Sequence, residues 1–284
     1  MSIDISPGQF VTSPDGTKIW AAACGNTSKP AVVFIHGFTC TADAFEQQYT
    51  DSTMLENLYI IRYDVRGCGR SDGPLNEEAY SSERQAEDFK AVIDAYGVAK
   101  PFVATWSLGG MVPPDVIAKY GPDSLAGHIM MASFPHRNMH KGIQHPVILG
   151  IIPGLITEDI AFFAKTLPDF VLSCVSPKFK LPYDVYAKWL GGAAPRAPVV
   201  RQSMLGRKQD DAAIMRIASH FPYLAIQGED DTHIIPEKLE KWMKDHLSQS
   251  EFHLLPGVGH APFYEAPEVT NKLILEFVRK YSDA

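Results

Sequence analysis

The chain has 284 residues, 45% of them hydrophobic, which suits one large α/β domain or a core domain with an insertion, with a sizeable buried core. Its formal net charge of −7 at pH 7 argues against a general nucleic-acid-binding protein. The longest apolar stretch, residues 146–156, is too short to span a bilayer, so no stable membrane insertion is expected.

Cysteine usage and the N-terminal residues indicate the compartment. The four cysteines match no zinc or redox spacing, although they could still form two disulfides; they are Cys24, Cys40, Cys68 and Cys174. Residues 1–10 hold no basic region followed by an apolar stretch, so no secretory signal is expected. We therefore expect a reduced protein in the cytoplasm, and the sequence does not indicate its oligomeric state.

Strands and helices are predicted to alternate along most of the chain. Short apolar or alternating runs predict strands at residues 9–12, 18–23, 31–35, 58–63, 101–105, 125–133, 222–227 and 251–255. Helical spacing of apolar residues predicts helices at residues 82–96, 108–120, 236–246 and 268–281. The first two strands are joined by a turn and should form a hairpin. The alternation implies an α/β fold with a mainly parallel sheet and helices on both faces.

Residues 134–216 interrupt this alternation. No clear strand appears there, and the aromatic and apolar residues fit helices or irregular segments. The segment holds eleven Lys and Arg against six Asp and Glu, so it is net positive in a net negative protein. We interpret it as a helical cap inserted into a core of residues 1–133 and 217–284, lying over the carboxyl ends of the strands, where open α/β sheets bind ligands. A helical extension that only adds stability is the alternative.

Ser107 lies where a predicted strand runs directly into a predicted helix. Such a sharp turn lifts a serine hydroxyl above the sheet edge, and it requires small residues two positions away on either side. Gly109 fills the later position, and Thr105 fills the earlier one, where glycine is usual. A serine placed in this way could attack a carbonyl group; a serine helix cap is the alternative. We expect altered packing under the turn at Thr105, and backbone strain there.

A nucleophilic serine needs a base and an acid that orients the base. His260 lies in a glycine-rich loop after the last predicted strand, a position that exposes a side chain above the sheet. Three acidic residues, Glu229, Asp230 and Asp231, follow the strand at residues 222–227. A loop histidine bonded to backbone and a solvated acidic loop are the alternative readings.

Together these segments resemble the α/β-hydrolase fold family, in its capped serine hydrolase branch, over nearly the whole chain. The matching motifs are His36-Gly37-Phe38, Tyr63 to Ser71, the Ser107 turn, Gly228-x-x-Asp231 and Gly259-His260-x-Pro262 with Glu265 downstream. The resemblance implies a catalytic triad in the chain order serine, acid, histidine. The family's spacing after the glycine selects Asp231 as the acid, with Asp230 as the alternative.

The resemblance also implies an oxyanion hole and a substrate class. The two donors would be the backbone N–H groups of Phe38 and Leu108, and His36 would hold the first of these loops. The implied function is a serine esterase that forms an acyl-enzyme on a largely apolar small ester, without cofactor or metal. Trp106 would pack under the cap or contact the substrate.

Other functions fit the sequence less well or share the same motifs. A dinucleotide site at Gly67-Cys68-Gly69 is disfavoured, because the third glycine is misplaced and no helix follows. A zinc site at His136, His140 and His145 lacks a fourth ligand at a known spacing. Carbon–carbon bond hydrolases, lactonases, thioesterases and perhydrolases share the triad and cap, and a ligand receptor with little turnover remains a different class.

Overall fold

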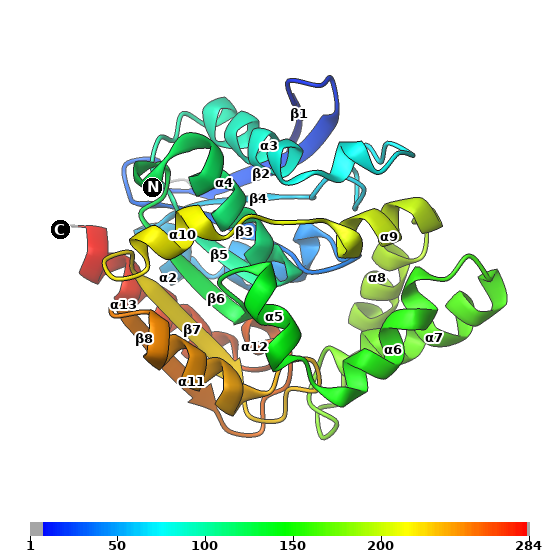
Figure 1. Cartoon of the computed structure of the whole chain (residues 1–284). Coiled ribbons are helices and arrows are strands. Elements are labelled where there is room, and N and C mark those ends of the chain that lie inside the picture. Colours follow the sequence, from blue (N-terminus) through cyan, green and yellow to red (C-terminus); the bar gives the residue numbers. More distant parts are fainter. Residues whose placement is uncertain (1–7, 283–284) are drawn as a thin grey trace.

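The centre of the computed structural model, which describes residues 8–282, is an eight-stranded sheet with helices on both faces (Figure 1). Its strand order is β1-β2-β4-β3-β5-β6-β7-β8. The strands are β1 (Gln9–Thr12), β2 (Lys18–Gly25), β3 (Ala31–Ile35), β4 (Tyr59–Tyr63), β5 (Phe102–Ser107), β6 (Gly127–Ser133), β7 (Tyr223–Gly228) and β8 (Ser250–Leu255). Among the strands of the described residues, only the pairings of β2 with β1 and β4 are antiparallel, so the sheet is mainly parallel as predicted.

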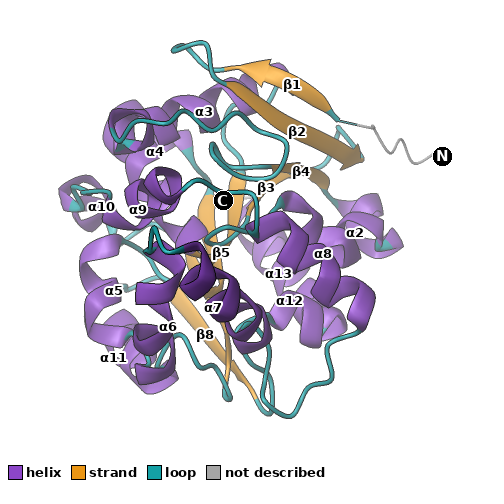
Figure 2. Ribbon diagram, turned by 90° about the vertical axis from the view of Figure 1, so that its right-hand side faces the viewer, coloured by secondary structure: helices purple, strands orange, loops and turns teal. Residues whose placement is uncertain are grey.

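Side chains of the central strands alternate between two hydrophobic clusters. In β3, Val32 and Phe34 belong to one cluster, whereas Val33 and Ile35 belong to the other. This period of two buries both faces of the sheet, as parallel sheets require. Figure 2 shows α2, α12 and α13 on one side of the strands and α3, α4 and α11 on the other. These helices are α2 (Ser52–Asn57), α3 (Ser82–Ala95), α4 (Val112–Tyr120), α11 (Pro236–His246), α12 (Pro262–Glu265) and α13 (Pro267–Ser282), and a short α1 (Glu46–Thr50) precedes them.

Six helices lie between β6 and β7, in the segment where no strand was predicted. They are α5 (Arg137–Ile143), α6 (Pro146–Ile156), α7 (Ile160–Ser173), α8 (Tyr183–Ala193), α9 (Pro198–Gly206) and α10 (Ala212–Ile217). Figure 1 shows α6 to α9 grouped together at one side of the molecule. The division into a core and a cap at residues 133/134 and 216/217 stays a prediction.

The eight predicted strands are all present, and the main differences concern helices. The helix predicted from Leu108 begins as a 3-10 turn over Leu108–Met111, and α4 starts only at Val112. Pro113 and Pro114 lie in the first turn of α4, where a missing N–H costs nothing. The short helices between β3 and β4 were not predicted, because they are too short to show a helical period.

The glycine-rich segment after β4 packs as a tight loop. Gly69 has φ +53°, and a Cβ there would lie 2.1 Å from the Asp64 carboxylate. That carboxylate accepts hydrogen bonds from the backbone N–H groups of Ala42 (2.7 Å) and Arg70 (2.8 Å). The glycine is therefore required by a buried carboxylate that ties neighbouring loops together.

Two further observations concern membranes and thiols. Within residues 8–282 no helix is both long and apolar enough to cross a bilayer. All four cysteines lie in this range, and each is buried and free of disulfides. The prediction about residues 1–10 falls largely on residues 1–7, which lie outside the described range.

Candidate active site

Four loops that follow parallel strands meet at one edge of the sheet. Ser107 ends β5, and the Phe38 loop follows β3. Asp231 follows β7 and His260 follows β8. Because the carboxyl ends of parallel strands share one edge, the sheet places these residues together, as the sequence predicted.

The backbone at Ser107 is strained. Its φ of 52° and ψ of −121° lie in a region that residues with a Cβ rarely adopt. The turn is possible because Gly109 packs directly on β3: a Cβ there would lie 2.5 Å from the carbonyl oxygen of Ile35. The strain predicted at Thr105 is therefore found at Ser107, the residue that turns the chain.

The carboxylate of Asp231 orients the ring of His260. The Nδ1 of His260 lies 3.0 Å from Oδ1 and 2.9 Å from Oδ2 of Asp231, and both residues are buried. Asp231 also accepts hydrogen bonds from the side-chain amide of Gln227 (2.6 Å) and the backbone N–H of His233 (2.6 Å). An acceptor-only carboxylate requires the proton on Nδ1, so Nε2 carries the lone pair. That Nε2 is buried and has no hydrogen-bond partner within residues 8–282.

Asp230 points elsewhere. Its carboxylate accepts a hydrogen bond from Ser176 Oγ (2.9 Å) and pairs with the ammonium of Lys178 (3.0 Å). The structure thus brings Asp231, and not its neighbour, against the histidine.

The loop after β3 lies against the serine. A Cβ on Gly37 would lie 3.1 Å from Cβ of Ser107, so glycine permits this close approach. His36 holds the loop: its Nε2 accepts from the backbone N–H of Val65 (3.0 Å), and its Nδ1–H donates to the carbonyl of Gly37 (2.8 Å). Phe38 lines the same pocket as Ser107 and Leu108. Leu108 begins the 3-10 turn, so its N–H has no acceptor within that helix.

A chain of hydrogen bonds under the turn explains the threonine. Ser133 Oγ donates to the carbonyl oxygen of Ser107 (2.7 Å), and Thr105 Oγ1 donates to Ser133 Oγ (3.0 Å). With both hydroxyl protons used in this way, Nε2 of His128 must be the donor to Thr105 Oγ1 (2.8 Å). The two hydroxyls and the imidazole therefore stabilise the strained turn through hydrogen bonds. A glycine at position 105 has no side chain and could not take part in them.

The titration of His128 gives a test of this hydrogen-bonded chain beneath the Ser107 turn. Burial lowers the pKa of His128 to about 3, whereas an imidazole in the unfolded chain has a pKa of about 6.5. Between these values only the unfolded state takes up the proton, so stability falls as the pH falls, by up to about 1.4 kcal/mol per pH unit. The contribution of neutral His128 to the free energy of unfolding is fully present above about pH 6.5.

We therefore expect His128→Gln, which retains an amide N–H in place of Nε2–H, to weaken the loss of stability in acid. The free energy of unfolding, measured with urea between pH 6 and pH 4.5, should fall less steeply in the variant than in the wild type. The difference between the two slopes should correspond to about one proton fewer taken up on unfolding. Equal slopes in the two proteins would contradict a buried neutral His128.

Trp106 clamps the loop of the histidine. Its indole N–H donates to the backbone carbonyl of His260 (2.8 Å), and its ring packs against Phe263 and Trp189. Trp106 is 1% exposed but also contributes to the pocket lining. The structure thus places it in a packing position next to the pocket, and substrate contact stays a prediction.

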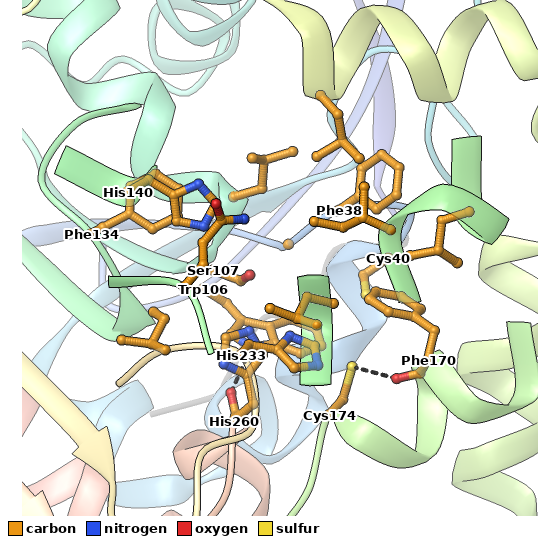
Figure 3. Close-up of a pocket in the computed structure, with 18 residues that line it drawn as sticks. Phe38, Cys40, Trp106, Ser107, Phe134, His140, Phe170, Cys174, His233 and His260 are labelled. Atoms are coloured by element: carbon orange, nitrogen blue, oxygen red, sulfur yellow. Dashed lines mark hydrogen bonds between the residues drawn. The ribbon is translucent and has the colours of Figure 1, made fainter. Parts of the chain in front are cut away.

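A pocket of about 540 Å³, including its open mouth, connects the serine and the histidine (Figure 3). Ser107 and His260 both line it, together with residues of the inserted helices. Three polar residues of its wall were not predicted: His140, Gln144 and His233. The sequence indicates His140 only as a candidate zinc ligand. The spacing of His140 and Gln144, one helical turn apart, is the sequence feature that places the two side chains on one face of a helix.

The three histidines of the disfavoured zinc site have separate partners. His136 faces Asp211 (3.0 Å), His140 stacks on Phe134, and Nδ1 of His145 accepts from the first turn of α6. No group of three potential ligand side chains suited to a metal ion occurs among the residues that the structure describes.

Comparisons with known proteins identify the family of this chain. The model of the Alpha/beta hydrolase family matches residues 32–273. The AB hydrolase superfamily protein YisY of Bacillus subtilis (strain 168) is 26% identical over 282 residues, which are 95% of this chain and 98% of that protein. The bifunctional esterase/perhydrolase DCH of Acinetobacter calcoaceticus is 22% identical over 280 residues, covering 95% and 99%. The crystal structure of esterase RhEst1 from Rhodococcus sp. ECU1013 superposes with a TM-score of 0.86 at 24% identity, covering 97% of this chain and 100% of that one.

Proposed function

The chain belongs to the alpha/beta hydrolase family, and from this membership we propose that it is a serine hydrolase that cleaves carboxylic esters through an acyl-enzyme. The observation that carries the proposal is the pairing of Asp231 with Nδ1 of His260 (2.9 Å), which leaves Nε2 of His260 without a hydrogen-bond partner among residues 8–282, in the pocket that Ser107 also lines.

In the first half of the reaction, Ser107 is the nucleophile. Its Oγ attacks the acyl carbon while Nε2 of His260 takes the hydroxyl proton. The tetrahedral intermediate collapses, the bond from the acyl carbon to the alcohol oxygen breaks, and His260 returns the proton to the departing alkoxide. Asp231 stabilises the imidazolium that exists between these two proton transfers.

In the second half, water replaces the alcohol. His260 removes a proton from water, the hydroxide oxygen bonds to the acyl carbon, and Ser107 Oγ leaves with the proton returned by His260. The acid is released and the free serine is restored.

Two backbone N–H groups would stabilise the negative oxygen of both intermediates. They belong to Phe38, in the loop packed on Ser107, and to Leu108, at the start of the 3-10 turn. Donors of this kind, fixed by the fold before the reaction, are each worth about 3–4 kcal/mol of transition-state stabilisation.

We further propose that α5 to α10 form a cap that supplies the substrate pocket. Their apolar side chains in the lining, Ile148, Ile152 and Leu155 of α6 and Phe170 of α7, favour an apolar substrate.

Covalent labelling tests the proposed function. A fluorophosphonate should form one Ser107–O–P bond with loss of fluoride, and mass spectrometry of the peptides should place the adduct on Ser107. Labelled protein should no longer hydrolyse 4-nitrophenyl butanoate. Labelling without multiple turnovers of any ester would indicate a receptor instead, and an unlabelled Ser107 would overturn the proposal.

A further inference from the structure

The geometry points to a second binding feature beside the reactive serine, and this inference rests on the proposed function. We propose that His140 and Gln144 form a subsite that hydrogen-bonds a neutral polar group of the substrate, a hydroxyl or a second carbonyl, while the opposite wall holds an apolar chain. The substrate class is therefore an uncharged ester bearing one further hydrogen-bonding group near the scissile bond.

The imidazole of His140 lines the pocket, and its ring nitrogens have no hydrogen-bond partner among the described residues. Its ring stacks on Phe134, with ring centroids 4.1 Å apart and an interplanar angle of 18°. This stacking covers one face of the ring and leaves its edge, which carries both nitrogens, for the pocket that His140 lines. Within residues 8–282 the side-chain hydrogen bonds include none to those nitrogens. Burial lowers the pKa of His140 to about 3, so the imidazole is neutral and offers one donor and one acceptor.

Gln144 lies one helical turn beyond His140. Residues four apart share one face of a helix, and Gln144 caps the C-terminus of α5, so both side chains face the pocket that they line. The backbone of Gln144 is fixed by a β-bridge to Ile234, in the loop after β7 that also carries Asp231. The end of α5 is thereby anchored to the loop that carries the proposed triad acid.

The next helix presents an apolar wall. Ile148, Ile152 and Leu155 recur at spacings of four and three on α6 and line the pocket together. Figure 3 shows Phe38 and Phe170 on the side of the pocket away from His140. The pocket therefore has one polar and one apolar side.

The subsite is neutral. None of the described residues that line the pocket is Lys, Arg, Asp or Glu. Burying a carboxylate or an ammonium without a partner is strongly unfavourable, so a charged substrate group is disfavoured. A hydroxyl or carbonyl, in contrast, satisfies the donors and acceptors of a neutral imidazole and a carboxamide.

Three matched substrates test the inference: 4-nitrophenyl hexanoate, its 3-hydroxy derivative and the 4-nitrophenyl monoester of adipic acid. For the wild type, kcat/KM should be about tenfold higher for the hydroxy ester than for the plain ester, a factor that corresponds to about 1.4 kcal/mol and lies within the range of one well-placed hydrogen bond. The monoester, which carries a carboxylate, should be the poorest substrate.

Variants then test whether His140 and Gln144 cause the preference for the hydroxy ester. His140→Phe and Gln144→Leu should bring the ratio of hydroxy to plain ester close to one, whereas Lys141→Gln, at an exposed position of the same helix, should retain the wild-type ratio. Equal kcat/KM for hydroxy and plain esters in the wild type, or a preference for the carboxylate, would overturn this inference alone. Failure to hydrolyse all three esters, together with failure to label Ser107, would overturn the proposed function and the inference with it.

Discussion

Replacing Ser107 by alanine is expected to lower kcat for 4-nitrophenyl butanoate by about 10⁶-fold, the loss seen when a triad nucleophile is removed. The variant keeps Cβ and therefore the packing against Gly37, where Cβ of the serine approaches closely. It also keeps the backbone conformation, because alanine and serine are strained alike at φ 52°. The measurement is kcat by continuous release of 4-nitrophenolate, with the thermal midpoint recorded in parallel.

The unchanged fold is what makes this variant decisive. The thermal midpoint of Ser107→Ala should match that of the wild type, and fluorophosphonate labelling should disappear. A variant that folds normally and retains more than about a thousandth of the wild-type kcat would show that another group is the nucleophile, since removal of a triad serine leaves far less.

The sequence predicted the sheet well because its signals are local. The apolar run at residues 31–35 is β3, and the hairpin of β1 and β2 follows from its turn. Ser107, the acidic residues 229–231 and His260 each follow a predicted strand, and because parallel strands end at the same edge, these segments were predicted to meet. The choice of Asp231 within the acidic segment came from the resemblance to the α/β-hydrolase family.

Hydrogen bonds between side chains of distant segments could not be predicted from local sequence signals. Thr105 was expected to be a site of strain, yet it is the middle of a hydrogen-bonded chain from His128 to Ser133. Nothing near Thr105 in the sequence indicates that a neighbouring strand supplies both partners. The polar side of the pocket was missed for a related reason: His140 and Gln144 come to the pocket only because the end of α5 lies against the loop after β7, where Gln144 bridges to Ile234.

The choice between two adjacent carboxylates illustrates the same limit. Motif spacing favoured Asp231, but Asp230 remained open, because a loop of unknown register can present either side chain. In the structure, Asp231 contacts His260, while Asp230 binds Ser176 and Lys178. A matched pair of substitutions can therefore separate their roles.

Asp231→Asn is expected to lower kcat by about 10⁴-fold, whereas Asp230→Asn should change it by less than about threefold. An asparagine side chain at position 231 can donate its amide N–H to Nδ1 of His260, which favours the tautomer with the proton on Nε2. The base would then lack its lone pair toward Ser107, and the imidazolium formed during the reaction would lose its counter-charge.

Both variants keep the size of the side chain, so they compare charge and hydrogen bonding at adjacent positions. Asp230→Asn removes an exposed ion pair with Lys178, and such pairs contribute little to stability. Steady-state kcat for 4-nitrophenyl butanoate between pH 6 and pH 9 is the measurement. Because loss of the correct tautomer is relieved when hydroxide itself removes the serine proton, the activity of Asp231→Asn should rise with pH more steeply than that of the wild type. Similar losses in the two variants would contradict the assignment of Asp231 as the residue that orients His260.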